Sequence, residues 1–400
     1  MDEDISIGQR IRHWRKRRRL TQEELAGLVG RSASWMTKVE RGELIVDKVS
    51  VLCALADILK IDLGYLIAGS KTSRNGGDPH DPPDGTEAVS HALFATWSPD
   101  REPSDAAMLR ADIERAGQLT CNGFYKAAAL VLPNILIDAR LAVAETVPGA
   151  YWCLAAAYHV VSRFARDVGE RELALLTADR GVATARNCGD KALNAAAARD
   201  LAFALLRRGD RWRDEAGTIC SNAADVLAPT DKSSAETWSL WGSLQLTGAV
   251  IQARARDADP VAARRLLADA RGAADRVGEG RNDYWEAFGP ANVCAHEIAV
   301  ALELGNAAEA LRLANRIDID ALPVPERRAH VLIDIARAHC LLQDHAETVA
   351  LLSEAVHHSP EDVRYSPKAR EMTHVCLALK STLPGLRDLA QRLGIATDSD

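Results

Sequence analysis

Helix-length segments, each closed by a turn and followed by a second helix, recur through residues 87–400. The predicted turns lie 40, 48, 48 and 39 residues apart, near Gly169, Gly209, Asp257, Gly305 and Asp344. A period of about 34 to 47 residues made of helix pairs is typical of an α-solenoid, because one pair alone cannot bury its apolar face. We therefore predict an α-solenoid of helix pairs for residues 87–400, with a single large helical bundle as the alternative.

The composition favours an all-α chain. Hydrophobic residues make up 47% of the 400 residues and aromatic residues only 5%, a mix that suits closely packed helices better than sheets. The eight cysteines are scattered singly, which indicates neither a zinc knuckle nor a disulfide framework. No stretch reaches the roughly 20 uninterrupted apolar residues of a membrane helix, and the N-terminus is acidic. We expect a cytoplasmic protein without a membrane partner.

One segment interrupts the helical pattern. Residues 69–86 are rich in Gly, Pro, Ser, Asn and Asp and lack apolar periodicity, which is typical of a flexible linker. The predicted organisation is therefore a small domain over residues 1–68, a linker over 69–86 and a large domain over 87–400 that senses and dimerises.

The small domain is expected to hold five short helices. Apolar spacing predicts the first helix up to about Arg19. Thr21 with Glu24 three residues later is a helix-capping pattern, and Ser32 and Asp47 are expected to cap the third and fourth helices. Residues 63–67 form the predicted final turn.

Positive charge is concentrated in this small domain. The whole chain carries a net charge of −7, yet residues 10–41 hold ten basic and three acidic residues. Such a local excess on an acidic protein suggests a polyanionic partner for the N-terminal part alone. A solvated helix face is the alternative explanation.

A series of positions in the small domain matches a known pattern in order: Gly8, Ile11, Arg15, the run Leu20 to Ala26, Gly30, Ser32, Met36, the run Val39 to Gly42, Leu52, Leu55, Ala56, Leu59, Ile61 and Leu66. With these residues the segment resembles the helix-turn-helix domain of the Cro/phage-repressor (XRE) family. The resemblance implies sequence-specific binding to double-stranded DNA by a homodimer, with the third helix in the major groove. It also implies a phosphate contact for Gln22 and an ion pair between Arg15 and Glu40.

The predicted DNA contacts lie on and beside the third helix. Met36 and Val39 are expected to face the core, which leaves the other side of the helix for base edges and backbone. The expected contacts on this helix are Ser32, Ala33, Ser34, Trp35, Thr37 and Lys38. Trp35 has buried packing as its alternative role, and the short side chains leave more recognition to phosphate contacts and DNA shape. Arg17, Arg18 and Arg19 are expected to touch phosphate, with a solvated helix end as the alternative.

The large domain shows no catalytic pattern. It lacks a Gly-x-Ser-x-Gly, a phosphate-binding glycine loop and a His-Glu-x-x-His. The pair His357-His358 has no obvious third ligand, so we expect no metal, no cofactor and no enzymatic activity.

An XRE domain followed by about six helix pairs is similar to tetratricopeptide-containing regulators, including the peptide-responsive RRNPP group. In such solenoids the first helix of each pair lines the concave surface. Polar and aromatic positions on these helices then become effector-binding candidates: Asn194, Trp238, Trp241, Gln245, Asn292, His296, Asp334 and Arg337. The alternative is that the polar residues are satisfied inside the solenoid and that the tryptophans are core residues.

We predict a DNA-binding transcriptional regulator whose solenoid dimerises and senses a peptide or small-molecule effector. The alternative is a scaffold or antitoxin-like protein whose solenoid binds a protein partner and whose DNA binding serves as a tether.

Overall fold

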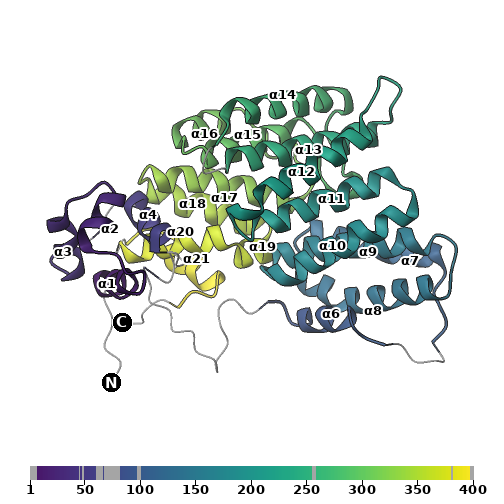
Figure 1. The fold of residues 1–400 in the computed structure, drawn as a ribbon, viewed down its shortest axis with the longest axis horizontal. Coiled ribbons are helices and arrows are strands. Elements are labelled where there is room, and N and C mark those ends of the chain that lie inside the picture. Colours follow the sequence, from purple (N-terminus) through teal and green to yellow (C-terminus); the bar gives the residue numbers. More distant parts are fainter. Residues whose placement is uncertain are drawn as a thin grey trace. The chain divides into compact units, whose positions relative to one another are not determined.

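The structure is a computed structural model that describes residues 7–44, 46, 49–59, 66, 82–96, 101–254, 258–379 and 382–396. Within these ranges every regular element is a helix, which confirms the all-α prediction (Figure 1). The chain divides into two compact units: residues 1–81 with 336–353 and 367–400, and residues 82–335 with 354–366.

The N-terminal helices of the first unit begin where the sequence predicts. They are α1 (Ile7–Arg17), α2 (Gln22–Leu28), α3 (Ala33–Glu40) and α4 (Val49–Leu59). The Thr21 hydroxyl accepts from the Glu24 amide at 3.1 Å and the Glu24 carboxylate accepts from the Thr21 amide at 2.7 Å, a complete capping box. Ser32 caps α3 through the Trp35 amide at 3.2 Å. Asp47 and most of the predicted final turn lie outside the described residues.

The remaining helices of the first unit come from the end of the chain. They are α20 (Pro367–Ala378) and α21 (Leu386–Arg392), and the Arg370 side chain donates to the carbonyl of Leu393 just after α21. Two helices supply residues to both units, namely α17 (Pro325–Leu341) and α18 (His345–His358).

The second unit is a succession of helix pairs (Figure 1). Its elements are α6 (Thr86–Ala92), α7 (Ala106–Cys121), α8 (Tyr125–Ala144), α9 (Ala150–Asp167), α10 (Arg171–Cys188), α11 (Lys191–Leu206), η1 (Asp210–Trp212), α12 (Arg213–Leu227), α13 (Ala235–Ala253), α14 (Pro260–Val277), η2 (Asp283–Trp285), α15 (Pro290–Glu303), α16 (Ala307–Ala314) and α19 (Pro360–Tyr365). Consecutive helices pack on each other from α7 to α16, as a helical-repeat solenoid requires.

The predicted turns of the repeat are present where the structure describes them. Gly169, Gly209 and Gly305 adopt φ of +87°, +112° and +76°, left-handed values that glycine takes without strain. Each is followed by the predicted second helix, and α18 begins directly after Asp344. Asp257 lies outside the described residues.

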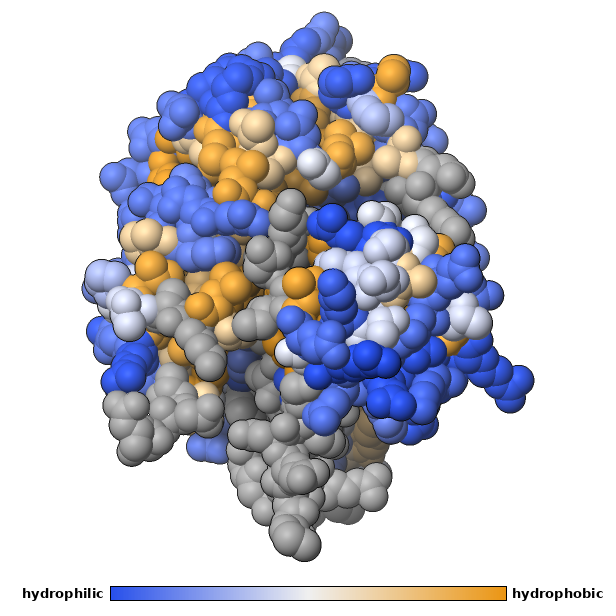
Figure 2. Space-filling model, turned by 90° about the vertical axis from the view of Figure 1, so that its left-hand side faces the viewer, coloured by the Kyte–Doolittle hydropathy of each residue, from blue (hydrophilic) through white to orange (hydrophobic). Residues whose placement is uncertain are grey.

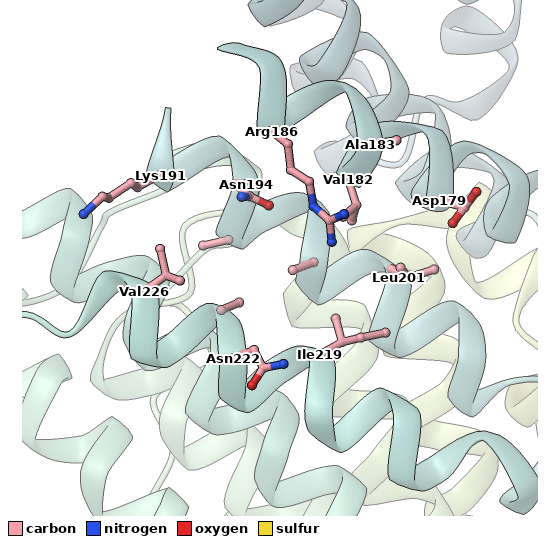
Figure 3. Close-up of a pocket in the computed structure, with 13 residues that line it drawn as sticks. Asp179, Val182, Ala183, Arg186, Lys191, Asn194, Leu201, Ile219, Asn222 and Val226 are labelled. Carbon is pink, nitrogen blue, oxygen red and sulfur yellow. The ribbon is translucent and has the colours of Figure 1, made fainter. Parts of the chain in front are cut away.

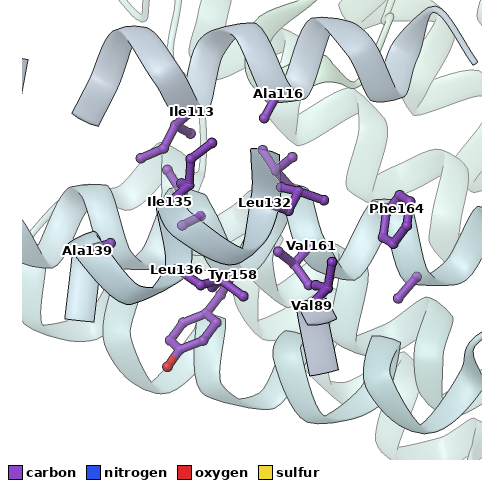
Figure 4. Packing of buried hydrophobic residues seen from close by; sticks show 14 of the residues in the cluster. Val89, Ile113, Ala116, Leu132, Ile135, Leu136, Ala139, Tyr158, Val161 and Phe164 are labelled. Carbon is purple, nitrogen blue, oxygen red and sulfur yellow. The ribbon is translucent and has the colours of Figure 1, made fainter. Parts of the chain in front are cut away.

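The core of the second unit is built largely from small residues. Figure 4 shows part of one apolar cluster, in which Ile113 of α7, Leu132 and Leu136 of α8 and Val161 of α9 interdigitate. Alanine side chains let adjacent helices approach closely, and Ala155, Ala157, Ala196 and Ala197 are at most 1% exposed. The described cysteines are free thiols.

Helix α8 is long and apolar enough to cross a membrane by length and composition alone, which the sequence reading did not anticipate. It contains Pro133, and its buried residues, including Leu132 and Leu136, pack in the core of the second unit. Its hydrophobicity is therefore that of a core helix.

Candidate functional site

Helix α3 is held against α1 at very short distance. A Cβ on Gly8 of α1 would lie 1.9 Å from the carbonyl oxygen of Val39, so only glycine fits there. Met36 and Val39 are buried against this contact, as predicted. The opposite side of α3 presents Ala33, Ser34 and Lys38, which are exposed.

The predicted ion pair between α1 and α3 is confirmed. The Arg15 guanidinium donates through Nε to Glu40 Oε1 at 2.5 Å and through Nη2 to Glu40 Oε2 at 2.9 Å, and it also donates to the Leu20 carbonyl at 2.8 Å. The hydrogen bonds that Arg15 donates to Glu40 raise the pKa of Arg15. Arg15 is therefore a structural residue that fixes α3, because removing it would leave Glu40 buried without its cation.

Gln22 and Thr37 extend this network across the α2–α3 junction. The Gln22 amide donates to Glu40 Oε2 at 2.7 Å, and its carbonyl oxygen accepts from the Thr37 hydroxyl at 3.0 Å. Both side chains are half-buried. Hydrogen bonds between α2 and α3 thus orient both side chains. The phosphate contact of Gln22 stays a prediction.

Two further predicted contacts lie at the start of α3. Ser32 is exposed, and its hydroxyl caps the helix. Trp35 is half-buried, and the Arg31 guanidinium lies 5.7 Å from its ring. Trp35 is therefore partly packed into the protein, and its DNA contact stays a prediction.

The three arginines at the end of α1, Arg17 to Arg19, differ in their surroundings. Arg17 is exposed and lies 5.1 Å from the ring of Trp14, and Arg19 is exposed at φ +58°. Arg18 donates through Nε to the carbonyl of Leu59 at 2.7 Å, which ties it to the last turn of α4. Figure 2 shows one face of the molecule, on which hydrophobic areas lie between hydrophilic ones.

The sequence of residues 6–64 matches the family model described as a helix-turn-helix domain. Residues 6–64 form a helix-turn-helix domain. The match spans α1 to α4 and confirms the helix-turn-helix domain predicted at the N-terminal part of the chain.

Among curated proteins, none matches this chain. The crystal structure of Bacillus thuringiensis PlcR in complex with the peptide PapR7 and DNA aligns with 87% of this chain and 99% of that chain, at 12% identity and a TM-score of 0.32.

The effector candidates of the second unit do not form one site. Asn194 lies in a groove of about 360 Å³ between α10, α11 and α12, together with Arg186, Asn222 and Leu201 (Figure 3). Trp238 and Trp241 are half-buried with ring centroids 5.8 Å apart, and the Arg276 guanidinium lies 4.6 Å from the ring of Trp238. These tryptophans pack against the α13–α14 core.

A second group lies on α15 and α17, beside buried charges. Asn292 and His296 are 2% and 8% exposed. Burial and then the nearby Arg327 and Arg199 lower the pKa of His296 to about 3. Gln245 on α13 is buried, while Asp334 and Arg337 on α17 are half-buried. Asn292 and His296 are therefore buried in a polar interior. This burial favours the alternative prediction that these residues are held inside the solenoid.

The sequence reading missed the most unusual feature of the second unit, a cluster of buried charges. Arg163 of α9 and Arg199 of α11 are 1% and 2% exposed. Arg163 lies 3.5 Å from Glu286 and 3.3 Å from Glu326, and Arg199 contacts the same Glu286 carboxylate oxygen. Burial opposes ionisation of Glu286, but Arg199 and Arg163 hold its carboxyl pKa below the usual value.

The same region contains three possible metal ligands. Ligand atoms of His159, Asp200 and Glu286 lie within 4.8 Å of one another. Asp200, however, contacts His159 Nδ1 at 2.5 Å and Arg166 at 3.5 Å, and Glu286 is paired with two arginines. A divalent cation would have to displace guanidinium groups that already neutralise these carboxylates. We interpret the group as part of the ion-pair cluster.

Proposed function

We propose that the chain is a sequence-specific transcriptional regulator that binds double-stranded DNA through α3. The observation that carries this proposal is the fixed placement of α3 within a helix-turn-helix domain. Gly8 and the Arg15–Glu40 pair hold one side of the helix, and Ser34 and Lys38 are exposed on the other. A rigidly held helix of this kind can present its exposed side chains to base edges in the major groove.

Affinity and selectivity are assigned to different residues. Lys38 reaches guanine O6 and N7 as a charged donor, and Ser34 and Ala33 contact neighbouring bases. Gln22, Arg17 and Arg19 contact phosphates, which contributes salt-dependent affinity without selecting a sequence. Because the reading helix offers few long side chains, recognition requires two copies on adjacent half-sites, and the helical repeat supplies the homodimer.

The helical repeat is assigned a sensing role. An effector bound to it changes DNA affinity when it prefers one conformation of the repeat over another. A short peptide is the proposed effector, since the repeat holds two buried arginines, Arg163 and Arg199, that suit a peptide's carboxylate. No enzymatic activity, metal or cofactor forms part of the proposal.

Selection of duplexes from a random library by the full-length protein tests the DNA-binding proposal. We expect one enriched palindromic sequence, bound at least tenfold more tightly than unrelated DNA. Lys38→Glu should abolish the enrichment, while the matched variant Lys232→Glu, an exposed lysine of the second unit, should retain it. Equal binding of all duplexes by the wild-type protein, or enrichment that survives Lys38→Glu, would contradict the proposal.

A further inference from the structure

The connection between α14 and α15 enters the interior of the second unit. Trp285, Glu286, Ala287 and Phe288 are each at most 4% exposed, although they belong to an interhelical connection. Connections of this kind normally run over the surface. The burial of all four residues is therefore unusual for an interhelical connection.

The backbone of this connection is held in an unusual conformation. Tyr284, Trp285 and Ala287 have φ of +47°, +61° and +51°, left-handed values that are unfavourable for residues with a Cβ. Such strain persists only where the surroundings over-determine the conformation. The connection is therefore held in place by the residues around it.

Two helices carry glycines that make room for its aromatic side chains. A Cβ on Gly117 of α7 would lie 2.1 Å from the ring of Trp285, and a Cβ on Gly242 of α13 would lie 2.1 Å from the ring of Phe288. Glycine within a helix is unfavourable by itself. Its presence at both positions means that the helices form two recesses, one for each aromatic ring.

Glu286 lies between these recesses and carries the charge of the segment. Its Oε2 contacts both Arg163 and Arg199, so the two arginines form a carboxylate-binding site on α9 and α11. The pairing is incomplete, because Glu286 Oε1, Arg163 Nε and Arg199 Nε are buried without a hydrogen-bond partner. Guanidinium groups bind carboxylates best through two parallel hydrogen bonds, and Arg163 makes only one long contact to Glu286.

We propose that residues 285–288 are an internal ligand of the helical repeat, and that the effector is a short peptide whose carboxylate, flanked by aromatic side chains, takes their place on Arg163 and Arg199. The internal ligand consists of Trp285, Glu286, Ala287 and Phe288. This inference rests on the sensing role given under the proposed function and names its ligand chemistry and its site.

Displacement of the internal ligand accounts for a change of state. The segment joins α14 to α15 and contacts α7, α9, α11 and α13. When a peptide occupies the site, these helices keep a ligand while the α14–α15 connection is released. The effector therefore distinguishes two conformations of the repeat, which is the requirement for a shift in their populations.

A synthetic peptide with the sequence of residues 281–290 tests the proposal on the full-length protein. In the wild-type protein the peptide competes with a tethered segment at high effective concentration, so we expect weak binding. Glu286→Gln should weaken the internal ligand and tighten peptide binding at least tenfold by calorimetry. The control variant Glu215→Gln, at an exposed position of α12, should behave as the wild type. A peptide with glutamine in place of its glutamate should bind neither the wild-type protein nor the Glu286→Gln variant.

Hydrogen exchange of the wild-type protein provides a second measurement that does not depend on the variant's folding. A high concentration of the glutamate peptide should accelerate exchange of the amides of residues 283–289, and the glutamine peptide should not. Unchanged exchange, or equal binding of both peptides by a folded Glu286→Gln variant, would overturn the proposal. Neither measurement uses DNA, so failure here is distinct from failure of the proposed DNA-binding function.

Discussion

The Cα of Gly117 lies directly against the indole of Trp285, at a distance that leaves no space for a side chain. A Cβ at this position would approach Cε2 to 2.1 Å and Nε1 to 2.4 Å. The residue is in the fourth turn of α7, where alanine would otherwise be favoured by about 1 kcal/mol. The absence of a side chain at Gly117 therefore provides the space that the Trp285 ring occupies.

Gly117→Ala should destabilise the second unit by roughly 1–3 kcal/mol, because the ring or the helix must move to relieve the overlap. Gly272→Ala is the matched control. Gly272 is also within a helix, α14, and a Cβ there would meet nothing within 4 Å. Gly272→Ala should therefore raise the free energy of unfolding by about 0.5–1 kcal/mol. Urea unfolding of the full-length variants measures both, and stabilisation by Gly117→Ala would show that Trp285 does not occupy this recess.

Arg15→Ala should lower the free energy of unfolding of the helix-turn-helix domain by about 3 kcal/mol, because Glu40 stays buried without its cation. Hydrogen exchange of the α1 and α3 amides in the full-length protein reports this loss locally. Lys16→Ala, an exposed neighbour on the same helix, serves as the control and should leave exchange unchanged. Identical exchange in both variants would remove the structural role of the ion pair.

Stability should fall as the solution becomes acidic, in part because of His296. Its folded-state pKa of about 3 lies below the ordinary value of 6.5. Between these two pKa values His296 binds a proton in the unfolded chain but not in the folded one. The free energy of unfolding is therefore largest above pH 6.5 and decreases as the pH falls. Between pH 7 and pH 5 this should amount to about 2 kcal/mol.

His296→Gln separates this contribution from that of other titrating groups. The variant should show a smaller loss of unfolding free energy between pH 7 and pH 5 than the wild-type protein. Chemical denaturation at each pH provides the comparison. Parallel pH profiles for the two proteins would mean that His296 takes up a proton inside the folded unit.

We expect dimerisation to reside in the helical repeat and not in the helix-turn-helix domain. Sedimentation of the full-length protein should give a dimer. A fragment of residues 1–67 should sediment as a monomer and bind operator DNA weakly, because one half-site contributes too little affinity. A tightly dimeric fragment would assign the interface to the N-terminal domain instead.

Local chemistry explains what the sequence predicted well. The Thr21 and Ser32 caps and the glycine turns depend on residues within a few positions of each other, and the structure contains them. The ion pair of Arg15 with Glu40 came from family resemblance, since the two residues are 25 positions apart.

The buried charges could not be placed in the same way. Arg163 and Arg199 are charged residues within alanine-rich, apolar helices. The sequence by itself could therefore have indicated that these two arginines are buried. Their partner Glu286 lies in a connection more than 80 residues further along the chain, and only tertiary packing brings it between them. Trp238 was predicted as an effector-binding candidate with a core role as the alternative, and it packs against the α13–α14 core. The sequence could not separate the two roles, because it does not show which neighbouring helix a side chain faces.

Lys38→Ala most directly tests the central claim that α3 reads DNA. Affinity for the selected operator should be measured with each base pair replaced in turn, for the wild-type protein, Lys38→Ala and Arg17→Ala. Lys38→Ala should lose roughly 1–3 kcal/mol of discrimination at one base position, whereas Arg17→Ala should weaken all sequences alike and reduce the salt dependence. Unchanged operator preference and affinity in Lys38→Ala would contradict the account.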